Sequence, residues 1–160
     1  MILFDFGGKI KGDSTKGGHD KWVQVDGAWL GLERAMIASS GGSDRDTDSP
    51  NFSEVRLTKP SDVSSVDLFV EAAGGTEPKK AAIHFCNESD SDKVDVYMSW
   101  ELENALITSY SVSTEDGKHA TETITLNFTK VKIAYTRFKP DGKQEKISPK
   151  GWNLETDCQL

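Results

Sequence analysis

The feature that most constrains this chain is an alternation of apolar and polar residues with a period of two, which recurs along much of its 160 residues. In segment 22–29, Val23, Val25 and Trp29 share one parity, whereas the other parity is mostly polar or small. Successive side chains of a strand point to opposite sides of the sheet. The pattern therefore predicts a strand with one buried face and one polar face.

Similar alternating runs occur at 52–57, 82–86 and 94–112. An Asp-Gly pair at 116–117 lies between two such runs, and a Pro-Asp-Gly turn follows at 140–142. Asp-Gly between alternating segments is a strong signal for a β-hairpin. Short strands and turns at this density predict an antiparallel sandwich or barrel.

The longest strand pattern, 121–136, changes parity in its middle. Its apolar residues are even-numbered up to Phe128 and odd-numbered from Val131 onward. A shift of one residue moves every side chain to the other face of a sheet. Either a β-bulge lies near 129–130, or the two halves of the strand bury opposite faces, as suits a strand that leaves its own core to pack on a neighbour.

One segment breaks the period of two. Val63, Val66 and Val70 are spaced by three and four residues, which is typical of the buried face of a helix. Ser61 and Asp62 are candidate N-caps, and a pair of glycines follows the apolar stripe. These signals predict one short helix over 61–74, packed against an otherwise all-β domain.

Length and composition predict a single domain over 1–160, since 36% of the residues are hydrophobic and suffice for a core. The formal net charge is −7, and no basic block is present, so we expect no nucleic-acid binding. No apolar stretch is long enough to cross a bilayer, and the first residues lack the pattern of a cleaved signal peptide. Cys86 and Cys158 are expected to be free thiols of a protein made in the cytosol.

Segment 38–51 is the one long connection and is predicted to be an extended flexible loop. Its Asp44-Arg45-Asp46-Thr47-Asp48 run opens like a calcium loop. Ser49 and Val55, however, stand where such a loop needs Gly and Glu. We therefore predict no metal site in this segment.

The remaining chemistry is sparse. His19, His84 and His119 have no zinc-site spacing, and the sequence contains neither a nucleophile elbow nor a phosphate-binding loop. The chain is accordingly predicted to have no catalytic residues, no metal and no cofactor, and not to be an enzyme.

Six motifs in order along the chain together resemble the haemolysin-coregulated protein (Hcp) family, the inner-tube protein of type VI secretion systems. They are KIKGDST at 9–15, WVQVDGAWLG at 22–31, VRLTKPSDVSSVDLFVEAAGG at 55–75, LENALITSYSVS at 102–113, ETITLNFTKVKIAY at 122–135 and GWNL at 151–154. The charged loop at 43–48 departs from the family, whose members often have a Gly- or Ser-rich loop at this place. The C-terminal sequence Cys158-Gln159-Leu160 also departs from the family pattern.

The resemblance implies a mainly β fold, a partly closed antiparallel β-barrel of two packed sheets with one short flanking α-helix. Six copies would form a hexameric ring, and rings would stack into a tube that a contractile sheath expels behind a VgrG-type spike protein. Small effector proteins would travel in the lumen. The protein would be cytoplasmic before firing and then secreted without a cleaved signal peptide.

Three surfaces are candidates for this assembly. A water-filled lumen needs a polar or small face opposite a buried one, which the predicted strand at 22–29 offers through Gln24, Asp26 and Ala28. The candidate ring-stacking residues of the long loop are Ser43, Asp44, Arg45, Asp46 and Asp48. The polar side of the helix is a candidate contact for the sheath or a neighbouring subunit through Asp62, Ser65, Asp67 and Glu71.

Two other functions remain open at this point. A stand-alone β-sandwich that binds carbohydrate or peptide would expose Trp22 or Trp100 as a stacking platform and would be a monomer. A small hydrolase would use His84 or His119 in a pocket of converging polar groups.

Overall fold

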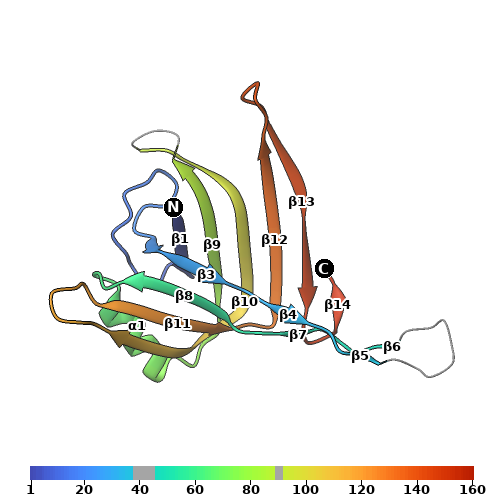
Figure 1. The fold of residues 1–160 in the computed structure, drawn as a ribbon, viewed down its shortest axis with the longest axis horizontal. Helices are drawn as coiled ribbons and strands as arrows, with labels where there is room; N and C mark the ends of the chain where they lie inside the picture. Colours follow the sequence, from blue (N-terminus) through green and yellow to red (C-terminus); the bar gives the residue numbers. More distant parts are fainter. Residues whose placement is uncertain (38–45, 89–91) are drawn as a thin grey trace.

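The alternating segments form two antiparallel sheets in the computed structural model of the chain, which describes residues 1–37, 46–88 and 92–160 (Figure 1). The larger sheet has the order β2-β1-β9-β10-β12-β13-β14. Its strands are β1 (Ile2–Phe6), β2 (Val23–Val25), β9 (Lys79–Glu88), β10 (Val94–Ser113), β12 (Lys130–Phe138), β13 (Gln144–Asn153) and β14 (Cys158–Gln159).

The smaller sheet has the order β10-β11-β8-β3, with β11 (Thr121–Asn127), β8 (Val55–Pro60) and β3 (Gly27–Trp29). Strand β10 is 20 residues long, and it belongs to both sheets because its two halves pair with different neighbours. At the opposite edge, β2 of the larger sheet continues through Asp26 into β3 of the smaller one. The predicted pair of packed sheets is confirmed, and the barrel that they form is not closed.

The core lies between the two sheets and is lined by one parity of each strand. The fully buried side chains of the smaller sheet include Leu57, Ile124 and Leu126, and those of the larger include Phe4 and Ile83. Apolar burial of this kind is the main favourable term in folding. The period of two in the sequence thus reflects strands with one face in this core.

The parity change within 121–136 marks a crossing between the sheets. Residues 121–127 form β11 in the smaller sheet, and the chain turns at 128–129 before β12 begins in the larger sheet. Because the two sheets face each other, both strands bury side chains in the same core with opposite parity. The prediction of one continuous strand was wrong, and neither a bulge nor a second core is needed.

The predicted strand at 22–29 is also two strands. Val23 and Val25 are buried as predicted, but the chain changes sheets at Asp26, whose backbone nitrogen donates to the Thr58 oxygen. Beyond this point the parity is reversed, so Trp29 is 53% exposed and Ala28 packs against the core. The prediction that Trp29 shares the buried face was therefore wrong.

The helix α1 (Ser65–Gly74) is shorter than the predicted 61–74, and its N-cap is Ser64 rather than Ser61 or Asp62. Its buried face consists of Ser64, Leu68 and Glu71, at spacings of four and three. The valine stripe predicted to face the core lies on the exposed side instead. The helix exists as predicted, but it is rotated with respect to the core.

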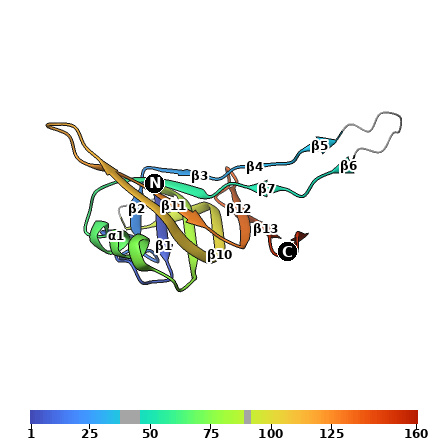
Figure 2. The same ribbon diagram turned by 90° about the horizontal axis from the view of Figure 1, so that it is seen from below.

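A long two-stranded arm extends from β3 and β8 away from the sheets (Figure 2). Its paired segments are β4 (Leu32–Glu33) with β7 (Asn51–Phe52), and β5 (Met36–Ile37) with β6 (Asp46–Thr47). The predicted loop 38–51 was therefore too long, because backbone pairing extends to residue 46. Residues 38–45 lie outside the described part of the chain.

Candidate functional site

The outer face of the smaller sheet consists mainly of small and hydroxyl-bearing side chains, with Trp29 and Arg56 as its large ones. The strand register aligns two rows across it, in which directly paired residues share a face. One row consists of Gly27, Thr58, Thr123 and Ser111. The other consists of Trp29, Arg56, Thr125 and Ser109.

Hydroxyl groups on this face bond to one another rather than projecting freely. The Thr125 hydroxyl oxygen lies 2.9 Å from that of Thr108 and 2.7 Å from that of Ser109. At the edge of the sheet, the Arg56 guanidinium lies 5.8 Å from the centre of the Trp29 ring. Arg56 is the one charged side chain of the two rows, and the Glu54 carboxylate lies beside them, where it accepts from the Thr108 hydroxyl at 3.0 Å. The face is therefore wettable and carries few charges.

The predicted lumen face does not exist as one surface. Gln24 lies on β2 in the larger sheet and Ala28 on β3 in the smaller one, and Ala28 packs against the core. Asp26 is exposed at the point where the chain changes sheets. The prediction failed because it assumed a single strand, and the alternating residues on β3 that face outward are Gly27 and Trp29.

The arm contains the described part of the predicted ring-stacking loop. Asp48 is exposed there, and its backbone nitrogen donates to the Ala35 oxygen at 3.2 Å. Near the base of the arm, the Ser49 hydroxyl donates to Asp157, which also accepts from the Trp152 indole nitrogen at 3.1 Å. The positions of Ser43, Asp44 and Arg45 lie outside the described residues, as does the side chain of Asp46.

The four polar helix residues predicted to face outward do not form one surface. Glu71 is buried, and its carboxylate forms an ion pair with Lys9 at 2.5 Å. Asp62 and Ser65 are half-buried, and only Asp67 is exposed. The set was wrong as an outward contact because three of its members hold the helix on the sheets.

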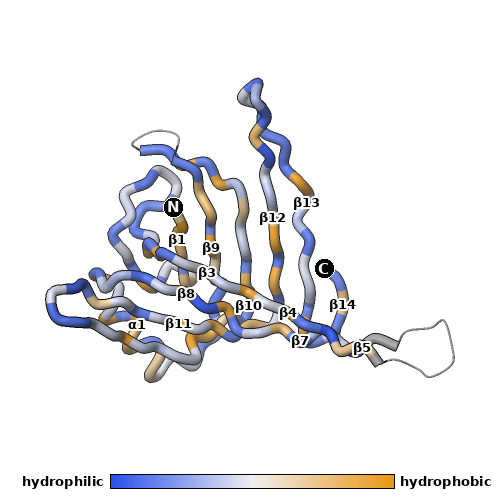
Figure 3. Tube along the Cα trace, viewed as in Figure 1, coloured by the Kyte–Doolittle hydropathy of each residue, from blue (hydrophilic) through white to orange (hydrophobic). Residues whose placement is uncertain are grey.

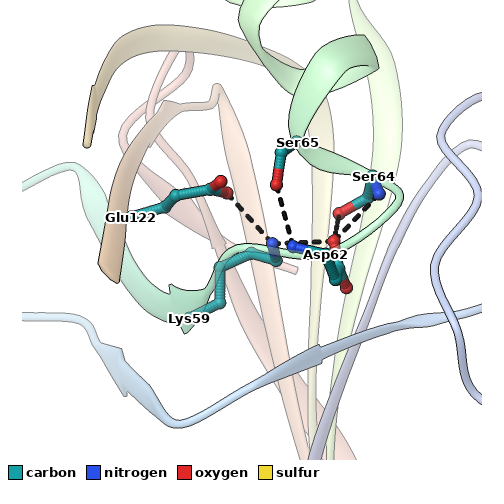
Figure 4. A network of polar contacts seen from close by, with 5 residues as sticks. All are labelled: Lys59, Asp62, Ser64, Ser65 and Glu122. Atoms are coloured by element: carbon teal, nitrogen blue, oxygen red, sulfur yellow. Dashed lines mark hydrogen bonds and ion pairs between the residues drawn. The ribbon is translucent and has the colours of Figure 1, made fainter. Parts of the chain in front are cut away.

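A buried charge network anchors the start of the helix (Figure 4). The Lys59 ammonium, which is fully buried, donates to Asp62 at 2.8 Å and to Glu122 at 3.0 Å. Asp62 also accepts a hydrogen bond from the Ser64 backbone nitrogen, at 2.9 Å. Sequence reasoning missed this network, although Lys59 and Glu122 both lie on the buried parity of their strands.

The network keeps Glu122 ionised. Burial alone raises the pKa of Glu122, but the neighbouring Ser65, Lys59 and Ser61 side chains, with the Lys59 charge, outweigh burial. The Lys59 ammonium bonds one carboxylate oxygen, and the other has no hydrogen-bond partner among the described residues. The net pKa therefore lies below its ordinary value. A charged glutamate inside the protein is stable only with such partners.

Two histidines and a tryptophan pack together where the segment before β2 meets β9. The His19 Nε2 lies 2.8 Å from the His84 Nδ1, and the Trp22 ring lies 4.7 Å from each imidazole. Burial and, secondly, the nearby His19 ring lower the pKa of His84 to about 4. His84 is thus neutral at pH 7 and serves to pack this segment on the sheet.

The residues expected for a carbohydrate- or peptide-binding module or for a hydrolase do not form, in the described part of the chain, the sites that those functions need. Trp100 is buried in the core, and Trp22 is half-buried against the histidines, so neither is the exposed platform that a sugar site needs. Within 1–37, 46–88 and 92–160, no hydrogen bond joins His84 or His119 to a serine, a cysteine or a carboxylate.

The described residues lack both a metal-binding cluster and a membrane-spanning helix. No group of three or more histidine, cysteine or acidic side chains could hold a metal ion. In the same part of the chain, no helix has the length and apolar character that crossing a membrane requires.

The fold and these surfaces define a class: an antiparallel β protein of two packed sheets with a projecting arm, whose notable features are broad faces rather than an enclosed catalytic pocket. Residues 4–135 match the family described as type VI secretion system effector, Hcp. The chain belongs to the Hcp family. Members of this family are secreted tube subunits of type VI secretion systems, and this chain is such a subunit.

Individual relatives agree with this assignment. The chain is 26% identical to protein hcp1 of Pseudomonas aeruginosa over 154 residues, covering 95% of this chain and 94% of that protein. A solved structure of a type six secretion system protein matches with a TM-score of 0.88 and 26% identity, covering 99% and 98% of the two chains. Hcp1 from Salmonella typhimurium shares the fold, with a TM-score of 0.75, 18% identity and coverage of 99% and 97%.

Proposed function

We propose that six copies of this chain close into a ring, that rings stack into a tube, and that the outer face of the smaller sheet lines the channel. The observation that carries the proposal is the pair of rows of small and hydroxyl side chains across four strands. A water-filled channel needs a wall that is wetted on one side and apolar on the other. This sheet has its apolar side in the core.

The chemistry of the channel wall affects which cargo the channel can hold. Hydroxyl groups present hydrogen-bond donors and acceptors without a fixed charge, so they tolerate cargo surfaces of varied chemistry. Trp29 and Arg56 are the large side chains of the two rows and would be the points of strongest contact. Small effector proteins therefore remain our proposed occupants of the lumen.

The arm is the proposed contact between stacked rings. It extends beyond the sheets, and it exposes Asp48 together with the apolar side chains of Leu32 and Met36. A projecting strand pair with both polar and apolar exposed residues can be covered by the next ring without changing the ring itself. Stacking is a contact separate from ring closure and extends into a filament.

The remaining partners follow from the proposed tube. It would be expelled by contractile sheath proteins behind a VgrG-type spike, and the subunit would be cytoplasmic until then and leave without a cleaved signal peptide. The chain itself would perform no catalysis. Its described polar clusters, around Lys59 and around His84, hold elements of the fold together.

Light scattering and cysteine labelling test this proposal. Light scattering should give six times the 17.6 kDa subunit mass, and a monomer at every concentration would contradict the ring. In a Cys158→Ser background, a cysteine at Thr123 should react with a small maleimide but not with a maleimide on a particle wider than the channel. The control is the unmodified chain, in which the exposed native Cys158 should react with both reagents. Equal reaction of Thr123→Cys with both reagents would place this face outside the channel.

A further inference from the structure

Three apolar side chains on α1 and one just before it form an exposed stripe, which we call the helix stripe. Its members are between 58% and 71% exposed, and they are Val63, Val66, Phe69 and Val70. Apolar residues spaced by three and four along a helix normally face a core. Here the core side of the helix is already occupied, and the stripe is largely uncovered in the described part of the subunit, where Phe69 alone has a ring contact, with Tyr110 at 6.0 Å between ring centres.

A second apolar surface lies on β12 and β13, and we call it the hairpin face. Ile133, Tyr135 and Ile147 are between 41% and 48% exposed. Tyr135 pairs directly with Ile147, so their side chains lie on the same face. Ile133 pairs with the core residue Trp100, which shows that this is the core face of the larger sheet. At these strands it is only partly covered.

The two surfaces lie at opposite sides of the subunit. Figures 1 and 2 both place α1 far from β13, and Figure 3 shows apolar residues along β12 and β13. Two different patches on opposite sides are what a head-to-tail contact requires, because each subunit uses one patch toward each neighbour. Such a contact closes into a ring when the rotation fits.

The charges around the two surfaces are complementary. Residues 61–77 contain no lysine or arginine, and of their acidic residues Asp67 and Glu77 are exposed, whereas Asp62 and Glu71 form ion pairs inside the subunit. Residues 130–150 have seven basic residues against Asp141 and Glu145. Lys150 pairs with Ile133 and so lies on the hairpin face, as does Arg137 with its ion-pair partner Glu145, whereas Lys130, Lys132 and Lys146 lie on the other face of the sheet. Opposite charges around apolar centres favour the pairing of these two surfaces over the pairing of either with itself.

We infer that the helix stripe of one subunit packs against the hairpin face of the next, and that this contact closes the ring. The inference rests on the proposed ring and names the residues that form it. The partner is thus a second copy of this chain. Each surface supplies the apolar centre of the contact, and the surrounding charges orient it.

Substitutions on each surface test the contact. Val66→Lys adds a positive charge opposite the basic hairpin, and Val66→Glu removes the same apolar group but adds a negative charge. Both should raise the concentration for half-assembly by about ten- to a hundredfold, and Lys should do so more than Glu at low salt. Leu160→Ser, which shortens an apolar side chain that is 43% exposed and belongs to neither surface, is the control that should keep the ring.

Mixing provides the sharper test. Ile147→Asp should break the ring as Val66→Lys does, yet each variant keeps the surface that the other has lost. Native mass spectrometry of a mixture should therefore show complexes containing both variants, whereas each alone stays monomeric. Circular dichroism would confirm that both monomers are folded.

The outcomes separate the two proposals. If the unmodified chain is a monomer throughout, the ring itself is refuted. If the unmodified chain forms rings and the Val66 or Ile147 variants form them equally well, the ring stands and this contact is wrong. Absence of mixed complexes from two monomeric variants would also overturn the pairing of these surfaces.

Discussion

Replacing Lys59 by methionine should cost this protein about 3–5 kcal/mol of unfolding free energy at pH 7. Methionine keeps most of the buried stem of the side chain, but it removes the ammonium that lies 2.8 Å from Asp62 and 3.0 Å from Glu122. The side chain of Glu122 is only 1% exposed, so its charge would be left without compensation, whereas Asp62, at 16%, retains some water. The cost arises mainly from Glu122.

The pH dependence of this loss identifies its cause. In the unmodified protein the pKa of Glu122 is lowered, so its stabilising contribution is present above the ordinary pKa of 4.5 and is lost as the pH falls below it. Without Lys59 the same carboxyl is buried and unpaired, so its pKa rises and protonation relieves the cost. The difference between the two proteins should therefore shrink as the pH falls from 7 toward 4.5.

Urea unfolding followed by tryptophan fluorescence measures both effects, at concentrations where the compared proteins share one oligomeric state. The double variant Lys59→Met/Glu122→Leu should recover most of the loss, because it removes the uncompensated charge together with its partner. Lys118→Met, which removes an exposed ion pair with Glu115, is the control and should change little. A loss below about 1 kcal/mol for Lys59→Met, or a loss independent of pH, would refute this account of the network.

Two further predictions concern stability. The pKa of His84 is about 4 in the folded protein against an ordinary 6.5, so stability should fall as the pH falls from 6.5 toward 4. Because the imidazole is only partly buried and solvent screens its charge, the loss should be about 1–2 kcal/mol rather than the full value of the shift. His84→Gln should flatten that part of the curve measured by urea unfolding. A Cβ atom on Gly151 would lie 2.4 Å from the Val131 oxygen, so Gly151→Ala should separate β13 from β12 and lower both the melting temperature and the ring population. Gly74→Ala, where a Cβ meets nothing within 4 Å, is the matched control and should leave both unchanged or slightly improved.

Local patterns in the sequence were sufficient for the fold class but not for the point where a strand changes sheets. Val23 and Val25 were assigned correctly, because alternation reports which parity is buried within one strand. The crossing at Asp26 reverses that parity, and it depends on pairing with Thr58, more than thirty residues away. For this reason Ala28 was predicted to face the lumen. In our proposal Gly27 and Trp29 face it instead.

The buried charge network left a signal that could have been used. Lys59 continues the parity of the buried residues Val55 and Leu57, and Glu122 continues that of Ile124 and Leu126. A lysine on the buried parity of one strand and a glutamate on that of another are candidates for a buried pair. Only the structure, however, shows that β8 and β11 are neighbours and that these two side chains meet.

The orientation of the helix shows why a subunit differs from a self-sufficient domain. The valine stripe that predicted the buried face is exposed, while Ser64, Leu68 and Glu71 face the sheets. Polar partners fix this orientation, since Glu71 pairs with Lys9 and Asp62 holds the first turn. The apolar stripe is left largely exposed, and a neighbouring subunit covers it in our inference. In a protein that buries part of its apolar surface only on assembly, the apolar periodicity of a helix identifies the residues that become buried. The buried polar contacts of the helix then decide whether those residues are buried when the subunit folds or when subunits assemble.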